Sequence, residues 1–151
     1  MIPLCILLIS FAVLRAIGWF GVHALDSFDL PLRAALCLMF LVTASAHWGK
    51  GRADLIRMVP LAFPNAPALV SITGCLEILG AIGLLLPATA RLAASCLALL
   101  LVALFPANVR AAREHLRILG RPVPGLAIRT VMQLIFITAL IAVGTHGFRY
   151  G

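Results

Sequence analysis

Apolar residues along the chain fall into five long blocks separated by short polar stretches. The blocks cover approximately residues 2–22, 30–48, 67–86, 91–109 and 126–146. Each block is close to the ~20 residues that a helix needs to cross about 30 Å of hydrocarbon. Because lipid offers no partner to unpaired backbone groups, segments of this length should be helical. The pattern predicts an all-α polytopic membrane helix bundle that forms a single transmembrane domain over residues 1–151.

The first block and the connection after the second block each allow two interpretations. Arg15 interrupts the first block and no Lys or Arg precedes it, so we expect a retained helix rather than a cleaved signal peptide. In the connection, the sequence RADLIRMVP mixes charged and apolar residues. It fits a short amphipathic helix that lies at the membrane interface and ends at Pro60. An ordinary polar linker explains the same residues equally well.

The basic residues of the connections are distributed unequally, which predicts an orientation. The 2–3 and 4–5 connections, with the segment beside them, carry Lys50, Arg52, Arg57, Arg110, Arg113, Arg117, Arg121 and Arg129. The opposite side carries only Arg33, Arg91 and Arg149. Since loops rich in Lys and Arg stay in the cytoplasm, we expect a cytoplasmic N-terminus and a C-terminus outside.

Composition strengthens the membrane interpretation and narrows the chemistry. The 151 residues are 63% hydrophobic and 11% charged, with a mean hydropathy of +1.12, whereas soluble domains carry about 25% charged residues. The net charge of +7 indicates contact with anionic lipid headgroups and not with nucleic acid, because no nucleic-acid-binding motif accompanies it. The four cysteines form no CxxC pair, and the scattered histidines indicate no metal site.

Glu77 lies at the middle of the third block, where a charge costs about 3 kcal/mol. We therefore expect its carboxyl to face the bundle and either pair with a cation or take up a proton. Arg15 is the one basic residue well inside an apolar block and lies at a similar depth. We predict an Arg15–Glu77 ion pair, and both residues are candidates for ligand binding or proton handling. Alternatively, the pair only holds the helices together.

Small residues surround Glu77 at every third position of the third block, and they include Gly74, Gly80 and Gly83. Small residues allow another helix to approach closely. The favoured interpretation is tight helix packing with Glu77 in the seam, and the alternative is a groove for a flat ligand beside the carboxyl.

Two further polar residues lie near the predicted cytoplasmic end. His47 ends the second block as an interface anchor, a ligand contact or a proton carrier. Pro106 is expected to bend the end of the fourth helix, where Asn108 can bind the freed backbone groups. We expect His47, Arg52, Asn108 and Arg110 to converge at that end.

Four motifs in order resemble the DoxX-like family of bacterial integral membrane proteins. They are SAHWGKGR (45–52), MVP (58–60), TGCLEILGAIGLLLP (73–87) and FPAN (105–108). The resemblance covers residues 32–112 well and the last helix more loosely. It implies a four-helix DoxX-like core in the bacterial cytoplasmic (inner) membrane, with the segment FAVLRAIGWFG as part of an extra N-terminal transmembrane helix.

The resemblance also implies which residues matter and what they serve. It assigns functional roles to His47, Glu77 and Asn108, and shaping roles to Pro60, Gly74, Gly80, Pro87 and Pro106. It connects the protein with membrane redox systems and suggests a quinone as a ligand, although no cofactor is evident in the sequence itself.

Three functions compete at this stage. The first is a non-catalytic subunit or assembly factor of a redox or envelope complex, with protein partners in the membrane and no activity of its own. The second is a protein that binds a quinone or another lipophilic molecule, with Glu77 and His47 supplying hydrogen bonds. The third, a proton-coupled transporter working through Glu77, lacks the paired half-repeats usual in transporters.

Overall fold

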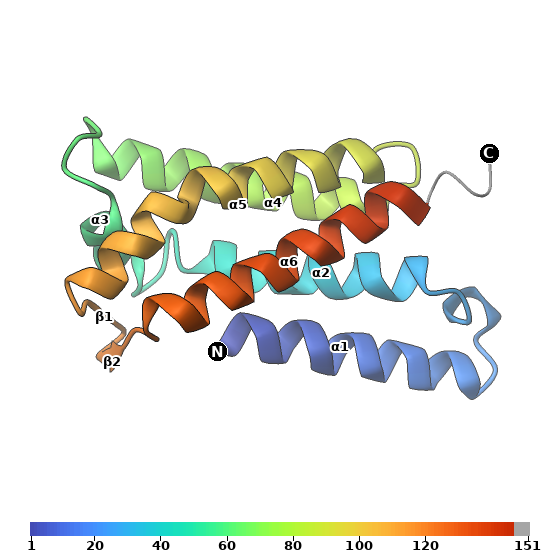
Figure 1. Ribbon diagram of the computed structural model, residues 1–151. Coiled ribbons are helices and arrows are strands. Elements are labelled where there is room, and N and C mark those ends of the chain that lie inside the picture. Colours follow the sequence, from blue (N-terminus) through green and yellow to red (C-terminus); the bar gives the residue numbers. More distant parts are fainter. Residues whose placement is uncertain (147–151) are drawn as a thin grey trace.

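The computed structural model describes residues 1–146 and is predominantly helical (Figure 1). Its elements in chain order are α1 (Ile2–Trp19), the 3-10 helix η1 (His23–Leu25), α2 (Asp29–Ser45), α3 (Arg52–Met58), α4 (Ala66–Leu85), α5 (Ala90–Arg113), β1 (Arg117–Ile118), β2 (Arg121–Pro122) and α6 (Leu126–His146). The long helices begin and end within about one turn of the predicted blocks. Arg149, which was counted in the predicted orientation, lies outside the described residues.

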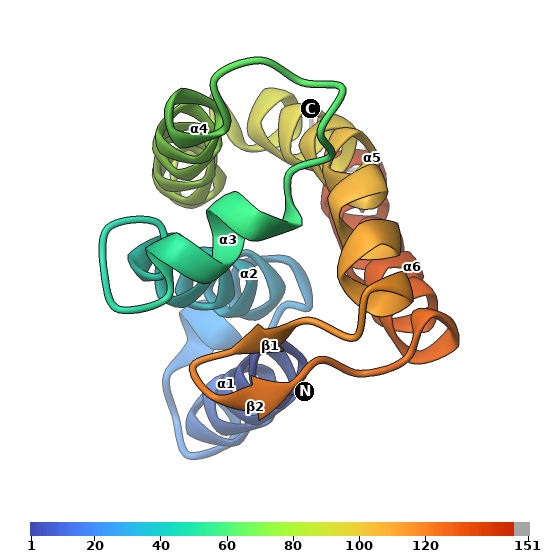
Figure 2. The ribbon, with the colours of Figure 1, turned by 90° about the vertical axis from the view of Figure 1, so that its left-hand side faces the viewer.

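Helices α2, α4, α5 and α6 form a four-helix core, and α1 packs outside this core along α2 (Figure 2). The largest fully buried side chains, Phe40, Leu36, Leu84, Leu97 and Leu140, come from all four core helices. The predicted all-α bundle, a four-helix core with an added N-terminal helix, is therefore confirmed.

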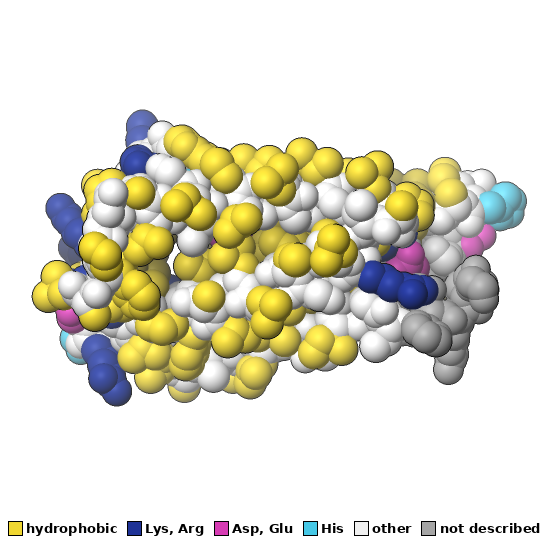
Figure 3. All heavy atoms as spheres, turned by 90° about the horizontal axis from the view of Figure 1, so that it is seen from above, with side chains coloured by type: hydrophobic (Ala, Val, Ile, Leu, Met, Phe, Trp, Pro, Cys, Tyr) yellow, Lys and Arg dark blue, Asp and Glu magenta, His cyan; other side chains and the backbone are white. Residues whose placement is uncertain are grey.

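Within residues 1–146, four helices are long and apolar enough to cross a membrane, namely α1, α4, α5 and α6. Their outer faces expose large apolar side chains such as Leu79, Leu92 and Leu99 (Figure 3). A soluble protein does not leave such a surface open, whereas acyl chains cover it in a bilayer. The chain is a membrane protein. Helix α2 was also predicted to span the membrane. It has 17 residues, one fewer than α1, the shortest of these four helices. Helices α1, α4 and α6 pack around it.

Helix α3 crosses the end of the bundle, and the β1–β2 hairpin lies beside it (Figure 2). The helical interpretation of RADLIRMVP is confirmed, although the helix ends at Met58 because Val59, which precedes Pro60, is extended. The hairpin lies in the connection between α5 and α6. Its two-residue turn has positive φ at Leu119 and Gly120, and Asp54 of α3 accepts the Leu119 N–H at 2.9 Å.

The basic side chains gather at this α3 end of the molecule, where α3, β1 and β2 lie (Figure 3). Lys50, Arg57, Arg113, Arg117 and Arg121 are exposed there. Helix α5 reaches this end because it continues through Pro106 to Arg113, beyond the predicted end at residue 109.

Candidate functional site

Glu77 lies on the buried face of α4, together with Val70, Gly74, Ala81 and Leu84. Their spacing of three and four residues places them on one side of the helix. The side chain of Asn65 accepts the Ala68 N–H and caps the start of α4. Glu77 itself is only 6% exposed, so the prediction that its carboxyl faces the bundle is confirmed.

Two side chains at the end of α2 contact the Glu77 carboxyl. The Thr43 hydroxyl donates to Oε2 at 2.9 Å, and Nε2 of His47 lies 3.6 Å from Oε1. Thr43 also lies 2.9 Å from the Phe40 carbonyl. A hydroxyl has only one proton to donate. If Thr43 donates that proton to the Phe40 carbonyl, its contact with Glu77 must be a hydrogen bond donated by a protonated Glu77 carboxyl.

The His47 ring links α2 to α4 at two points. Its Nδ1 donates to the Val70 carbonyl at 2.5 Å, while Nε2 faces Glu77. A neutral His47 with its proton on Nδ1 has no proton on Nε2, the nitrogen that faces the carboxyl. One further proton, shared between Nε2 and the carboxyl, allows a hydrogen bond between the two groups. That proton resides either on the imidazole, which forms an ion pair, or on the carboxyl.

His47 lies just beyond α2, and its pKa is raised. Burial by itself would lower the pKa of the imidazole, but the Glu77 carboxylate and the Val70 carbonyl outweigh it because both favour the protonated ring. Both contacts therefore favour the protonated form of the His47 ring.

Arg52 secures the backbone behind His47. Its Nη1 donates to the His47 carbonyl at 2.7 Å, and its Nη2 donates to Ser71 Oγ at 2.9 Å and the Pro67 carbonyl at 3.1 Å. The guanidinium thus joins the turn after α2 to the first turns of α4.

The glycine face of α4 is filled by neighbouring side chains. A Cβ on Gly74 would lie 2.7 Å from the His47 side chain and 2.8 Å from Trp48, and one on Gly80 would lie 2.5 Å from Leu97. At Gly83 the nearest atom would be Ala93 Cβ at 2.8 Å. These distances confirm tight helix packing as the role of the small residues.

The predicted Arg15–Glu77 pair is wrong. Arg15 lies in the last turns of α1, and its Nη1 donates to the backbone carbonyls of Leu25, Asp26 and Ser27 at 2.9, 2.5 and 3.2 Å. Helix α1 ends at Trp19, earlier than expected, and packs against α2 instead of α4. Arg15 therefore binds the η1 turn that follows its own helix.

The predicted convergence of His47, Arg52, Asn108 and Arg110 holds only for the first two. Asn108 Nδ2 donates to Gln133 Oε1 at 3.1 Å, and Asn108 Oδ1 accepts from Arg129 of α6. Arg110 binds Glu114 and the Val59 carbonyl. Asn108 and Arg110 lie on α5, which packs mainly against α6 and α4.

Sequence reasoning missed three polar residues that contact the core helices. Arg33 is buried, pairs with Asp29, and donates to the Leu84 and Leu85 carbonyls at 2.6 and 2.9 Å. It thereby caps the end of α4. Gln133 and Thr43 complete the clusters around Asn108 and Glu77. A signal existed for Gln133, an amide four residues after Arg129 in an otherwise apolar block.

Two of the shaping prolines lie where the chain changes direction, and the third lies within a helix. Pro60 follows α3, and Pro87 lies in the short turn between α4 and α5. Thr89 in that turn donates to the Gly83 carbonyl at 2.9 Å. Pro106 lies inside α5 without ending it.

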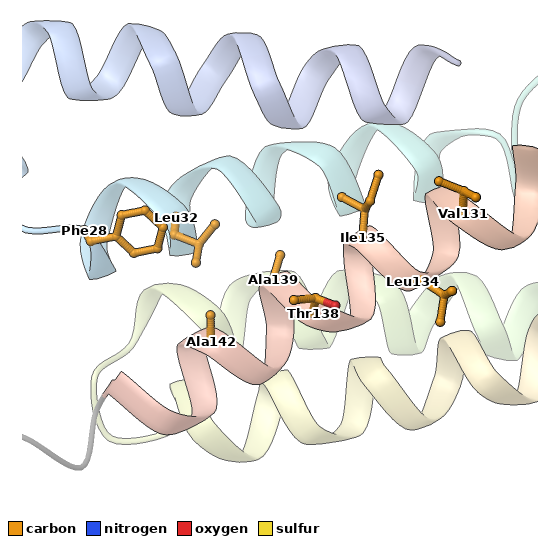
Figure 4. Close-up of a pocket in the computed structure, with 8 residues that line it drawn as sticks. All are labelled: Phe28, Leu32, Val131, Leu134, Ile135, Thr138, Ala139 and Ala142. Carbon is orange, nitrogen blue, oxygen red and sulfur yellow. The ribbon is translucent and has the colours of Figure 1, made fainter.

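An apolar groove of about 460 Å³ runs along α6 where it faces the first half of α2 (Figure 4). Its lining includes Phe28, Leu32, Ile135, Ala139 and Ala142, with Thr138 as the one side chain bearing a hydroxyl. Glu77 does not line this groove. Among the described residues, no group of three or more His, Cys, Asp or Glu is placed to hold a metal ion.

Comparison with known proteins gives a family and no described activity. A family model described as a domain of unknown function (DUF8561) matches residues 36–144. No curated protein and no solved structure matches the chain. The matched segment runs from the middle of α2 to the end of α6 and includes Glu77, His47 and Asn108. Since the model spans well over half of the chain, the protein belongs to the DUF8561 family.

Proposed function

We propose that the protein is a DoxX-like, non-catalytic subunit or assembly factor of a redox or envelope complex in the bacterial inner membrane. The observation that supports this most strongly is the closure of the Glu77 site. The carboxyl, the His47 ring and Arg52 all bind neighbours within the chain. Groups that satisfy one another hold helices in register and leave little free for a reaction.

The outer surface supports the same function. Helix α1 contacts the core mainly through α2 and exposes most of its apolar residues. An added helix at the edge of a bundle offers a face to other membrane proteins as well as to lipid. The basic α3 end belongs in the cytoplasm under the positive-inside rule, which places both Met1 and α3 on that side.

The test is isolation of the tagged protein from native membranes in lipid nanodiscs without detergent. We expect a membrane protein to co-isolate in a fixed molar ratio and to be absent from a control preparation of an unrelated tagged polytopic protein. Mass spectrometry gives the ratio. Recovery of the chain with lipid alone, at native expression, would contradict the proposal.

A lipophile-binding function is the second candidate, and the groove between α2 and α6 favours it. Its volume of about 460 Å³ falls in the range of small-molecule sites, roughly 300–1,000 Å³. The groove lies apart from Glu77, so a ligand there would contact apolar side chains and Thr138 and would not contact the carboxyl. A quinone remains one lipophile of suitable chemistry.

Two variants separate this candidate from a Glu77-centred ligand site. Ala139→Phe fills the groove, and we expect it to remove a co-purified lipophile detected by native mass spectrometry. Glu77→Gln should leave that lipophile bound. The matched control Leu99→Phe adds the same ring on the exposed face of α5. Loss of the lipophile in Glu77→Gln but not in Ala139→Phe would place the ligand at the carboxyl instead.

A further inference from the structure

Arg129 carries a positive charge that no acidic side chain of the chain neutralises. The five acidic residues all lie within the described part of the chain, and each has another basic partner. The ion pairs are Asp26–His23, Asp29–Arg33, Asp54–Arg57, Glu77–His47 and Glu114–Arg110. Arg129 takes part in none of them.

The guanidinium is partly buried and incompletely bonded. Nη2 donates to Asn108 Oδ1, but Nε is buried and has no hydrogen-bond partner among the described residues. A buried donor without an acceptor costs free energy, and more so on a charged group. The third nitrogen, Nη1, is neither buried nor hydrogen-bonded among the described residues, so it is the donor open to an acceptor from outside the chain.

Asn108 and Gln133 hold the guanidinium in place. Asn108 uses its carbonyl for Arg129 and its amide for Gln133, which is only 8% exposed. These contacts join α5 to α6 and fix the direction of the Arg129 side chain. The neutral Asn108 amide orients the charge without neutralising it, and Gln133 in turn holds Asn108.

The location indicates the kind of anion. Arg129 is the fourth residue of α6, about 5 Å along a helix long enough to span the membrane. The positive end of the helix dipole lies in the same turn. The exposed Arg113, Arg117 and Arg121 belong to the same α3 end, so the local potential attracts anions from the headgroup layer.

We propose that Arg129, oriented by Asn108, is a binding site for a phosphate oxyanion from outside the chain. Nη1, the guanidinium nitrogen that is open to the outside, donates to one phosphate oxygen, and the guanidinium charge balances the anion. The phosphate belongs either to the headgroup of an anionic phospholipid or to free inorganic phosphate. This inference does not depend on the proposed subunit function.

The test compares the full-length delipidated protein with Arg129→Gln, using Arg113→Gln as the control. Arg113 lies at the end of α5, is exposed, and carries the same charge. Phosphatidylglycerol and phosphatidylcholine are titrated separately and bound lipid is counted by native mass spectrometry. Inorganic phosphate is tested by thermal shift against chloride at equal ionic strength.

For a lipid headgroup, we expect Arg129→Gln to weaken phosphatidylglycerol binding about tenfold and Arg113→Gln to change it less than about twofold. For free phosphate, the same contrast appears in the thermal shift and not in the lipid titration. Arg129→Lys, which keeps the charge but lacks the guanidinium that Asn108 orients, should lose affinity to an intermediate degree and serves if Arg129→Gln misfolds. Equal effects of the Arg129 and Arg113 substitutions on both ligands would overturn the proposal.

Discussion

At the scale of residues, ionisable side chains inside the bundle meet specific neighbours from other elements. Glu77 is bound by Thr43 and His47, Arg33 caps α4, and Arg15 binds the η1 turn. Each contact removes the cost of leaving a charge or a donor in an apolar surrounding. Arg129 differs because one of its guanidinium nitrogens is buried without a hydrogen-bond partner among the described residues.

The His47–Glu77 pair should make stability depend on pH. The pKa of His47 is raised in the folded protein above its unfolded value of about 6.5. A raised pKa stabilises the fold fully below the unfolded pKa, and this contribution is lost as the pH rises through the folded pKa. We expect the unfolding temperature in nanodiscs to fall over that interval.

His47→Gln should remove this pH-dependent component, whereas His23→Gln should keep it, because the His23 side chain is almost fully exposed. Thermal unfolding followed by circular dichroism between pH 5 and pH 9 measures both. A His47→Gln protein with the pH profile of the wild type would show that the pair contributes nothing.

At the scale of elements, α4 determines how the core closes. His47 and Trp48 pack against its glycines on one side. Leu97 and Ala93 of α5 pack against them on another. These contacts bring α2 and α5 against the same helix, while Arg33 and Thr89 bind the carbonyls at its end. Close approach of the backbones increases van der Waals contact, which matters in lipid because apolar burial between helices gains little there.

Gly80→Val should destabilise the bundle by about 1–3 kcal/mol, because its side chain would overlap the buried Leu97. Gly144→Val in α6 is the matched control, since nothing lies within 4 Å of a Cβ at that position. The comparison is made by unfolding both variants in the same lipid. Equal stability of the two variants would show that the α4–α5 contact is loose.

At the scale of the whole molecule, charge is distributed along the long axis. Basic residues collect at the α3 end, where Asp54 and Arg110 tie α3, the hairpin and α5 together. The other end holds Asp26, Asp29, the buried Arg33 and the exposed Arg91, and so carries fewer basic residues. With apolar sides between the two ends, the molecule has the charge asymmetry that orients membrane proteins.

This arrangement predicts labelling from opposite sides of the membrane. In a variant without the native cysteines, Lys50→Cys and Arg121→Cys should react with an impermeant maleimide from the cytoplasmic side. His23→Cys should react from the other side. The measurement uses intact cells and inverted vesicles in parallel. Labelling of positions 50 and 121 from different faces would contradict the location of both positions on the same side of the membrane, at the α3 end.

Much of the fold could be read from the chain because the cost of exposing backbone groups to lipid constrains each segment separately. The length of each apolar block therefore determined where the long helices lie. The same reasoning placed Glu77 inside the bundle, since an exposed carboxylate in hydrocarbon is unfavourable whatever its neighbours. It also placed the glycines of α4 in a packed seam.

The partners were decided only by the tertiary structure. Glu77 binds Thr43 and His47 instead of Arg15 because α2, and not α1, lies against α4. Asn108 joins Gln133 and Arg129 because α6 lies against α5. A linear pattern records how apolar each segment is and which face is small or polar, but not which helix is adjacent. Adjacency arises from the simultaneous packing of all the helices, and it decided which buried polar groups found partners and which did not.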